Sequence, residues 1–88
     1  MPSISMFYGI VIYMYQEVNN KHHQPHIHAN YSGENVVVNF EGEVLSGSFP
    51  KKQLQLLTAW IVIHKEELEA NWRLLEAGEQ TYRIAPLK

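Results

Sequence analysis

The first predicted strand, at residues 7–16, has apolar side chains on both of its faces. Aromatic and β-branched residues alternate there without leaving a polar face. Such a pattern is typical of a strand that is covered on both sides. A second strand is predicted at residues 26–31. Its alternate residues face opposite ways, with Ile27, Ala29 and Tyr31 on one face and His26, His28 and Asn30 on the other.

Two further strands follow, each after a short turn. Residues 35–41 predict a third strand with three apolar residues facing the interior: Val36, Val38 and Phe40. Ser32-Gly33 and Glu41-Gly42 are turn signals, because glycine adopts positive φ without strain. Residues 43–48 predict the fourth strand. Short turns between successive strands predict an antiparallel meander.

A single long helix is predicted from Pro50 to about Ala77. Proline fits the first helical turn, and Gly78 suits the position just after a helix end. Seven residues recur on one stripe at steps of three and four: Leu54, Leu57, Ile61, His64, Leu68, Trp72 and Leu75. The last ten residues look extended. The predicted fold is therefore α+β, a small antiparallel β-meander of about four strands packed on one long helix in the C-terminal half, with residues 1–88 forming a single domain.

The predicted helix is longer than the predicted sheet. A helix of about 27 residues spans roughly 40 Å, whereas a six-residue strand spans about 20 Å. We expect Trp60, Trp72 or the tyrosines of the first strand to bury this overhang against a second subunit, which predicts a homodimer. The alternative is a bent or broken helix.

Composition excludes several kinds of site. The chain has no cysteine, and therefore no disulfide, thiol nucleophile or thiolate metal site. It has no aspartate either, so glutamates must fill most carboxylate roles. A net charge of −2 argues against general capture of nucleic acid, although a local basic patch stays open. The apolar segment 4–15 is too short to span a bilayer and lacks signal-peptide features. We therefore expect a cytoplasmic protein with no membrane partner.

Four of the five histidines lie within residues 22–28. Imidazole binds metal ions and changes charge near neutral pH. His26 and His28 are two residues apart on a predicted strand, so their side chains share a face and could bind one ion. His22 or His23 could supply a third ligand if the loop folds back. Zinc is the candidate cofactor, and nickel and copper also suit imidazole.

His64 is a further candidate, because it lies on the stripe of the predicted helix that should face the sheet. If Ile27 and Ala29 face the helix, His26 and His28 face away from it, and His64 could join them only across a subunit interface. With the opposite register, His64 could join them within one chain. A different alternative is that these histidines bind no metal and instead hydrogen-bond to backbone and water or transfer protons. The candidate functional cluster is His22, His26, His28 and His64.

Lys51 and Lys52 lie in the first turn of the predicted helix. Free backbone N–H groups at a helix start attract anions. The two lysines could therefore bind a phosphate, a nucleic-acid backbone or the carboxylates of a partner. The alternative is that they are simply solvated at the surface.

Several separated motifs resemble domain-of-unknown-function family 4160. They are Phe7-Tyr8-Gly9-Ile10, Ile12-Tyr13-Met14-Tyr15, His22-x-x-Pro25-His26-Ile27-His28-Ala29-x-Tyr31, Trp60-x-x-x-His64-x-x-Glu67-Leu68-x-x-Asn71-Trp72, Gly78 and Ile84-x-Pro86-Leu87. The usual loop of the family reads Asp-His-x-Pro-Pro-His-Phe-His-Ala, from which this chain departs at Lys21, Gln24 and Ile27. The residues that match the family pattern include His22, His26, His28 and His64, whereas His23 is additional. The lost aspartate would have been a natural hydrogen-bond partner for a ligating histidine.

The resemblance implies a short bacterial protein. Genes of the family often lie beside another small protein family in a toxin–antitoxin-like arrangement, which implies a small protein partner encoded nearby. Our leading interpretation is therefore a protein–protein interaction component of such a module. The alternative is a histidine-dependent hydrolase or nuclease, with or without zinc. An enzyme requires a cleft where His26, His28 and a third polar group converge, whereas a binding module requires an exposed apolar or aromatic patch. Direct regulation of DNA is not favoured, because the sequence has no recognisable helix-turn-helix and no basic face.

Overall fold

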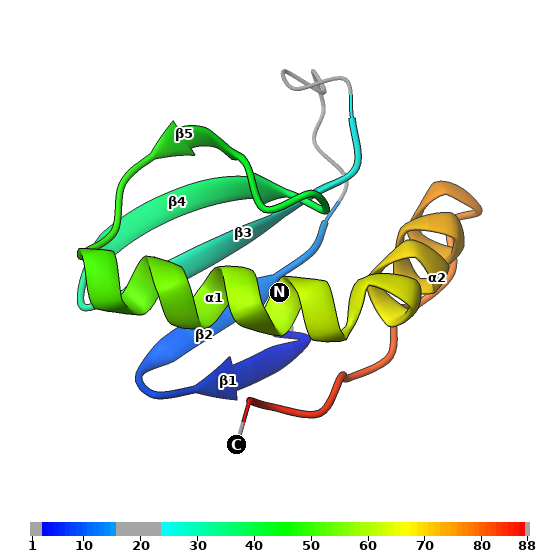
Figure 1. Cartoon of the computed structure of the whole chain (residues 1–88). Helices are drawn as coiled ribbons and strands as arrows, with labels where there is room; N and C mark the ends of the chain where they lie inside the picture. Colours follow the sequence, from blue (N-terminus) through cyan, green and yellow to red (C-terminus); the bar gives the residue numbers. More distant parts are fainter. Residues whose placement is uncertain (1–2, 16–23, 88) are drawn as a thin grey trace.

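The computed structural model describes residues 3–15 and 24–87 of the 88-residue chain. Within these residues, five strands form one antiparallel sheet in the order β1-β2-β3-β4-β5, and two helices follow (Figure 1). The elements are β1 (Ser5–Phe7), β2 (Ile10–Tyr13), β3 (His26–Tyr31), β4 (Glu34–Asn39), β5 (Val44–Gly47), α1 (Lys51–Ile63) and α2 (Lys65–Glu76). The predicted α+β class and the antiparallel meander are confirmed.

The single strand predicted at residues 7–16 is wrong: this segment contains the hairpin between β1 and β2. The turn residues Tyr8 and Gly9 both have positive φ, 48° and 79°, as a two-residue type I′ turn requires. Phe7 and Ile10 therefore pair directly across the hairpin. The prediction failed because apolar alternation continues through the turn and because tyrosine is uncommon at positive φ.

One face of the sheet packs against α1. Ile27 and Ala29 lie on that face, paired with buried valines of β4. His28 and Asn30 therefore lie on the opposite face. The predicted division of β3 residues between two faces is confirmed, and of the two orientations left open by the sequence the structure has the one with Ile27 and Ala29 facing α1. The predicted turn at Ser32-Gly33 is also confirmed, since both residues have positive φ.

The connection between β4 and β5 is longer than the two residues predicted. β4 ends at Asn39, and β5 begins at Val44. The Asn39 side-chain oxygen accepts hydrogen bonds from the backbone N–H groups of Glu41 and Glu43, at 3.0 and 2.8 Å. These bonds hold the wider turn closed. A register shift follows within the β4–β5 ladder, and it makes Leu45 the extra residue of a β-bulge.

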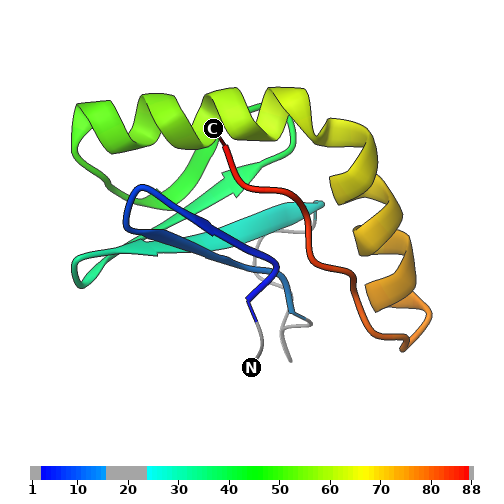
Figure 2. The same cartoon turned by 90° about the horizontal axis from the view of Figure 1, so that it is seen from below.

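The predicted long helix is divided at His64 into α1 and α2, which is the broken-helix alternative. His64 has φ −108° and ψ 23°, yet its N–H bonds Trp60 O and its C=O accepts from Leu68 N–H, both at 2.9 Å. The bend lets α1 lie along one face of the sheet while α2 turns past the sheet's end (Figure 2). No straight helix overhangs the sheet, so helix length gives no support to a second subunit. Within the described residues, neither helix is long and apolar enough to cross a membrane.

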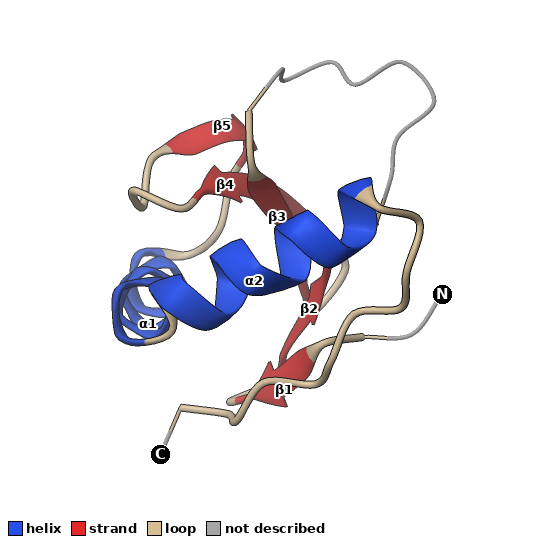
Figure 3. Cartoon of the chain, turned by 90° about the vertical axis from the view of Figure 1, so that its right-hand side faces the viewer, coloured by secondary structure: helices blue, strands red, loops and turns tan. Residues whose placement is uncertain are grey.

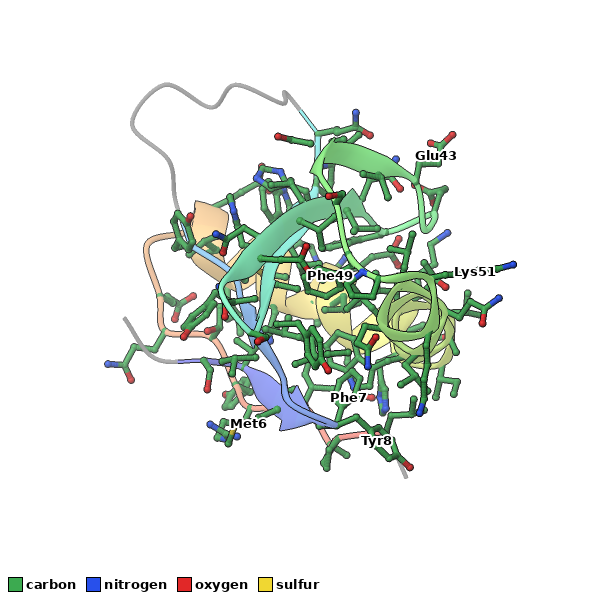
Figure 4. The ribbon with its side chains drawn as sticks, turned by 90° about the vertical axis from the view of Figure 1, so that its left-hand side faces the viewer. Met6, Phe7, Tyr8, Glu43, Phe49 and Lys51 are labelled. Carbon is green, nitrogen blue, oxygen red and sulfur yellow. The ribbon has the colours of Figure 1, made fainter. Side chains whose placement is uncertain are left out.

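The hydrophobic core lies between the sheet and α1, with Trp60 at its centre. Trp60 is fully buried within one chain. Its ring lies 5.5 Å from that of Phe7, and its Nε1–H donates to the carbonyl of Ala85 at 2.8 Å. Figure 4 shows Phe7 and Phe49 on the side of the sheet that faces α1, whereas Met6 points away from it.

The C-terminal segment, residues 79–87, is fastened to the rest of the molecule by a few hydrogen bonds. Ile84 N–H donates to Ile4 O at 2.7 Å, so this segment runs beside β1 (Figure 3). The Asn71 amide donates to Tyr82 O at 2.8 Å and accepts from Tyr82 N–H at 2.9 Å. The segment closes the side of the molecule between β1 and α2.

Candidate functional site

The structure brings His26 and His28 together at the start of β3. Their ring centroids are 5.2 Å apart, in an edge-to-face arrangement. The two-residue spacing along a strand places both side chains on the face that is opposite Ile27 and Ala29. His22 and His23, the other histidines of the run, lie outside the described residues.

His26 is held in a fixed orientation. It is only 2% exposed, and its ring lies 5.3 Å from that of Trp72 on α2. Its Nδ1 is 2.6 Å from the carbonyl oxygen of Gln24. Because a carbonyl oxygen only accepts hydrogen bonds, Nδ1 carries a proton, and in the neutral imidazole the lone pair is on Nε2.

His28 lies beside two tyrosines of the neighbouring segment. Tyr13 is its direct cross-strand partner on β2. Tyr15 stacks on the imidazole, with ring centroids 4.3 Å apart, and its hydroxyl lies 3.2 Å from His28 Nδ1. These three aromatic residues, with Ala29, Asn35 and Val36, line a pocket of about 510 Å³. The pocket combines ring faces with phenol, imidazole and amide groups, so it could bind a planar or polar group.

His64 does not join this pair. It lies at the bend between the helices, where its ring is 5.4 Å from that of Trp60. Its Nδ1–H donates to the Glu67 carboxylate at 2.5 Å. In the parts of the chain that the structure describes, no three histidine or acidic side chains form a group that could hold a metal ion. The register therefore matches the alternative in which His64 could reach His26 and His28 only across a subunit interface.

Lys51 and Lys52 lie in the first turn of α1, and both are exposed. Lys51 extends away from the sheet (Figure 4). Pro50 caps the helix without a side-chain hydrogen bond. The anion site suggested by the sequence stays a prediction.

One ion pair joins α2 to the turn between β4 and β5. Lys65 Nζ donates to Glu41 Oε2 at 2.7 Å. This hydrogen bond, together with the charge of the Glu41 carboxylate, raises the pKa of the Lys65 ammonium group above its usual value. Both side chains are solvent-exposed, so the pair contributes little to stability.

Sequence reasoning did not include Tyr13, Tyr15 and Trp72 among the site residues. Tyr13 and Tyr15 share a strand face with His28 only in the observed β2–β3 register. Trp72 reaches His26 only because the helix bends at His64. The spacing of the two tyrosines was the one signal in the sequence, since alternate residues of a strand share a face.

These features define a small α+β protein with one helix-covered sheet face, a second face bearing aromatic and imidazole groups, and a buried histidine, His26, beside a half-buried one, His28. The chain belongs to the family described as a domain of unknown function, DUF4160, whose model matches residues 9–73. The match includes all five histidines and ends before Gly78 and the segment 84–87. No curated protein and no solved structure matches the chain.

Proposed function

We propose that this protein is a small protein-binding module that uses the sheet face opposite α1. This open face consists of Val11, Tyr13, Tyr15, His28, Asn30, Asn35 and Val37. Its side chains are apolar, aromatic or amide, and most are half-buried within one chain. Protein interfaces are enriched in aromatic residues and depleted of charge at their centre. The observation that carries the proposal is that α1 covers only one face of the sheet (Figure 2), while the residues on the other face are mainly aromatic, apolar or amide.

The edges of the sheet are less suited to a partner than the open face. The edge strand β5 has only four residues, contains the bulge at Leu45 and is followed by Pro50. Short strands, bulges and proline all discourage pairing with another strand. At the other edge, Ile84 bonds to Ile4 beside β1. A partner that used the face would avoid both obstacles.

The partner we propose is a small protein encoded beside the gene, in a toxin–antitoxin-like pair of the bacterial cytoplasm. The family resemblance supports this part of the proposal. The open face contains no lysine or arginine, and phosphate recognition depends mainly on such cations. A protein partner therefore fits this face better than a nucleic acid does.

Co-expression with the protein of the adjacent gene tests the proposal. We expect the two proteins to co-purify and Val37→Lys to abolish the complex, because a lysine at the centre of an apolar interface loses its hydration. Val62→Lys is the matched control, since Val62 lies on α1 and is already 69% exposed. Equal loss of the complex in both variants, or none in either, would contradict the use of the open face.

A second candidate function is histidine-dependent hydrolysis, including cleavage of RNA. One observation favours it: the Tyr15 hydroxyl and His28 Nδ1 are 3.2 Å apart in a pocket, within reach for proton transfer. His26 is nearly buried and belongs to the end of the sheet covered by α2, so it does not line that pocket. RNA oligonucleotide cleavage that is lost in His28→Ala and kept in His64→Ala would support this function. Activity that survives His28→Ala would dismiss it.

A further inference from the structure

The pocket on the open face has the composition of a site for a small planar ligand. Its volume of about 510 Å³ is within the range of ordinary ligand pockets. The rings of Tyr13, Tyr15 and His28 line it together with Asn35. We propose that this pocket binds the base of an uncharged nucleoside, and that adenine is the base it suits best.

The side-chain amide of Asn35 is oriented by its neighbour. Asn35 lies directly opposite Asn30 in the β3–β4 ladder, and its Oδ1 accepts a hydrogen bond from Asn30 Nδ2–H at 2.9 Å. Among the described residues its side chain makes no other hydrogen bond. One lone pair of Oδ1 and the whole NH₂ group are therefore available to a ligand. An amide pairs with adenine in this way, accepting from the N6 amino group and donating to N7.

Aromatic rings supply the contact area that a flat base needs. Stacking on aromatic side chains is a main source of affinity for bases. Tyr15 and His28 already stack on each other, with ring centroids 4.3 Å apart, so both rings form a wall of the pocket before any ligand enters. Binding uses the surfaces of these rings and requires no free nitrogen or hydroxyl on either residue.

The charges around the pocket select a nucleoside over a nucleotide. The open face contains no lysine or arginine, whereas phosphate recognition depends mainly on such cations. Another pocket, of about 250 Å³, does contain a cation, because Arg73 lines it beside Trp72, so a phosphate would favour that pocket instead. A tryptophan side chain fits the open face less well than a base. Indole offers only a donor N–H, which would leave the Asn35 NH₂ group without an acceptor.

NMR titration of the full chain with adenosine tests the site in the absence of any protein partner. We expect saturable shifts of the Asn35 side-chain amide and of Tyr13. Ribose is the matched control ligand and should cause none, because it lacks the base. Inosine has an oxygen in place of the N6 amino group, so it should bind roughly two- to tenfold more weakly. Adenosine 5′-phosphate should bind no more tightly than adenosine.

Asn35→Asp is the most specific variant, because the carboxylate still accepts from Asn30 but has no NH₂ group to donate to the base. Asn35 is exposed, so this variant should fold, and we expect adenosine to bind it about tenfold more weakly. Tyr13→Ala should weaken binding by about tenfold or more, through the loss of a stacking surface. Tyr82→Ala is the matched control: Tyr82 is 73% exposed and lies in the C-terminal segment, so its loss should leave binding unchanged.

The nucleoside site and the protein partner can fail separately, because the partner is tested by co-expression and by Val37→Lys. Absence of saturable adenosine binding, equal binding of ribose, or full affinity in Asn35→Asp would each overturn the nucleoside site. Tighter binding of adenosine 5′-phosphate that is lost in Arg73→Gln would assign binding to the other pocket, and would also overturn it.

Discussion

At the scale of single residues, two buried asparagines fix segments that have no regular structure. Asn39 and Asn71 are each 2% exposed. Asn39 closes the turn after β4 by accepting two backbone N–H groups, and Asn71 pairs with both backbone groups of Tyr82. Buried amides are stable only when hydrogen-bonded. The hydrogen bonds that make each buried asparagine stable therefore also hold a neighbouring loop in a fixed position.

Replacing Asn71 by alanine should destabilise the protein by about 1–3 kcal/mol, because it removes two hydrogen bonds and leaves a void under the C-terminal segment. Urea unfolding measures this change. The control is Asn30→Ala: Asn30 donates to Asn35 in an exposed pair at 2.9 Å, and its loss should cost less than about 0.5 kcal/mol. Equal costs in the two variants would show that the Tyr82 contacts add no stability.

At the scale of elements, sequence predicts what local signals determine and misses what tertiary packing determines. The Ser32-Gly33 turn and the faces of β3 follow from residue type and alternation, and the histidine spacing predicts that His26 and His28 share a face. The helix break is different, because no proline or glycine lies near His64 and the apolar period continues through it. The short sheet provides the physical reason, since only a bent helix can bury Leu68 and Trp72 at its end.

The close packing of β5 against β4 depends on Gly47. Gly47 has φ 78°, and an added Cβ would lie 2.2 Å from the carbonyl oxygen of Asn35. We expect Gly47→Ala to cost about 3 kcal/mol or more, through positive φ and overlap together. Gly33→Ala is the control, because Gly33 has φ 85° but no atom within 4 Å of the added Cβ, so only the backbone term of about 1–2 kcal/mol applies. Thermal unfolding of the two variants compares these costs, and a Gly33 variant as unstable as the Gly47 variant would contradict the overlap argument.

The ion pair between Lys65 and Glu41 makes the free energy of unfolding depend slightly on pH in the alkaline range. The pKa of Lys65 is raised in the folded protein above its usual 10.5, so its contribution is fully present below 10.5 and is lost as pH rises through the higher folded value. The unfolding free energy of the wild type should therefore fall more steeply above pH 10.5 than that of Lys65→Gln. Tyrosines also ionise there, but both proteins share them. Parallel curves from urea unfolding across this range would show that the pair contributes nothing.

At the scale of the whole molecule, the sheet has two unlike faces. α1, Trp60 and the C-terminal segment bury one face within the chain. The open face keeps its aromatic and amide residues at the surface. Because a small domain buries a smaller share of its surface on folding than a large one, a partner on this face would add buried area that the chain lacks. Stability thus depends on one side of the sheet, and the proposed binding uses the other. A substitution on the open face can therefore change binding without unfolding the protein.

The homodimer predicted from the sequence is an alternative to a different protein as the partner of the open face, and it can be measured. The open face lies on three adjacent strands, β2, β3 and β4, and its aromatic residues are of the kind enriched in protein interfaces. We expect sedimentation velocity to show a concentration-dependent dimer, and Val37→Lys to sediment as a monomer. Val62→Lys, on the exposed side of α1, should still dimerise. A wild type that stays monomeric at every concentration would rule out self-association and leave the open face to a different protein.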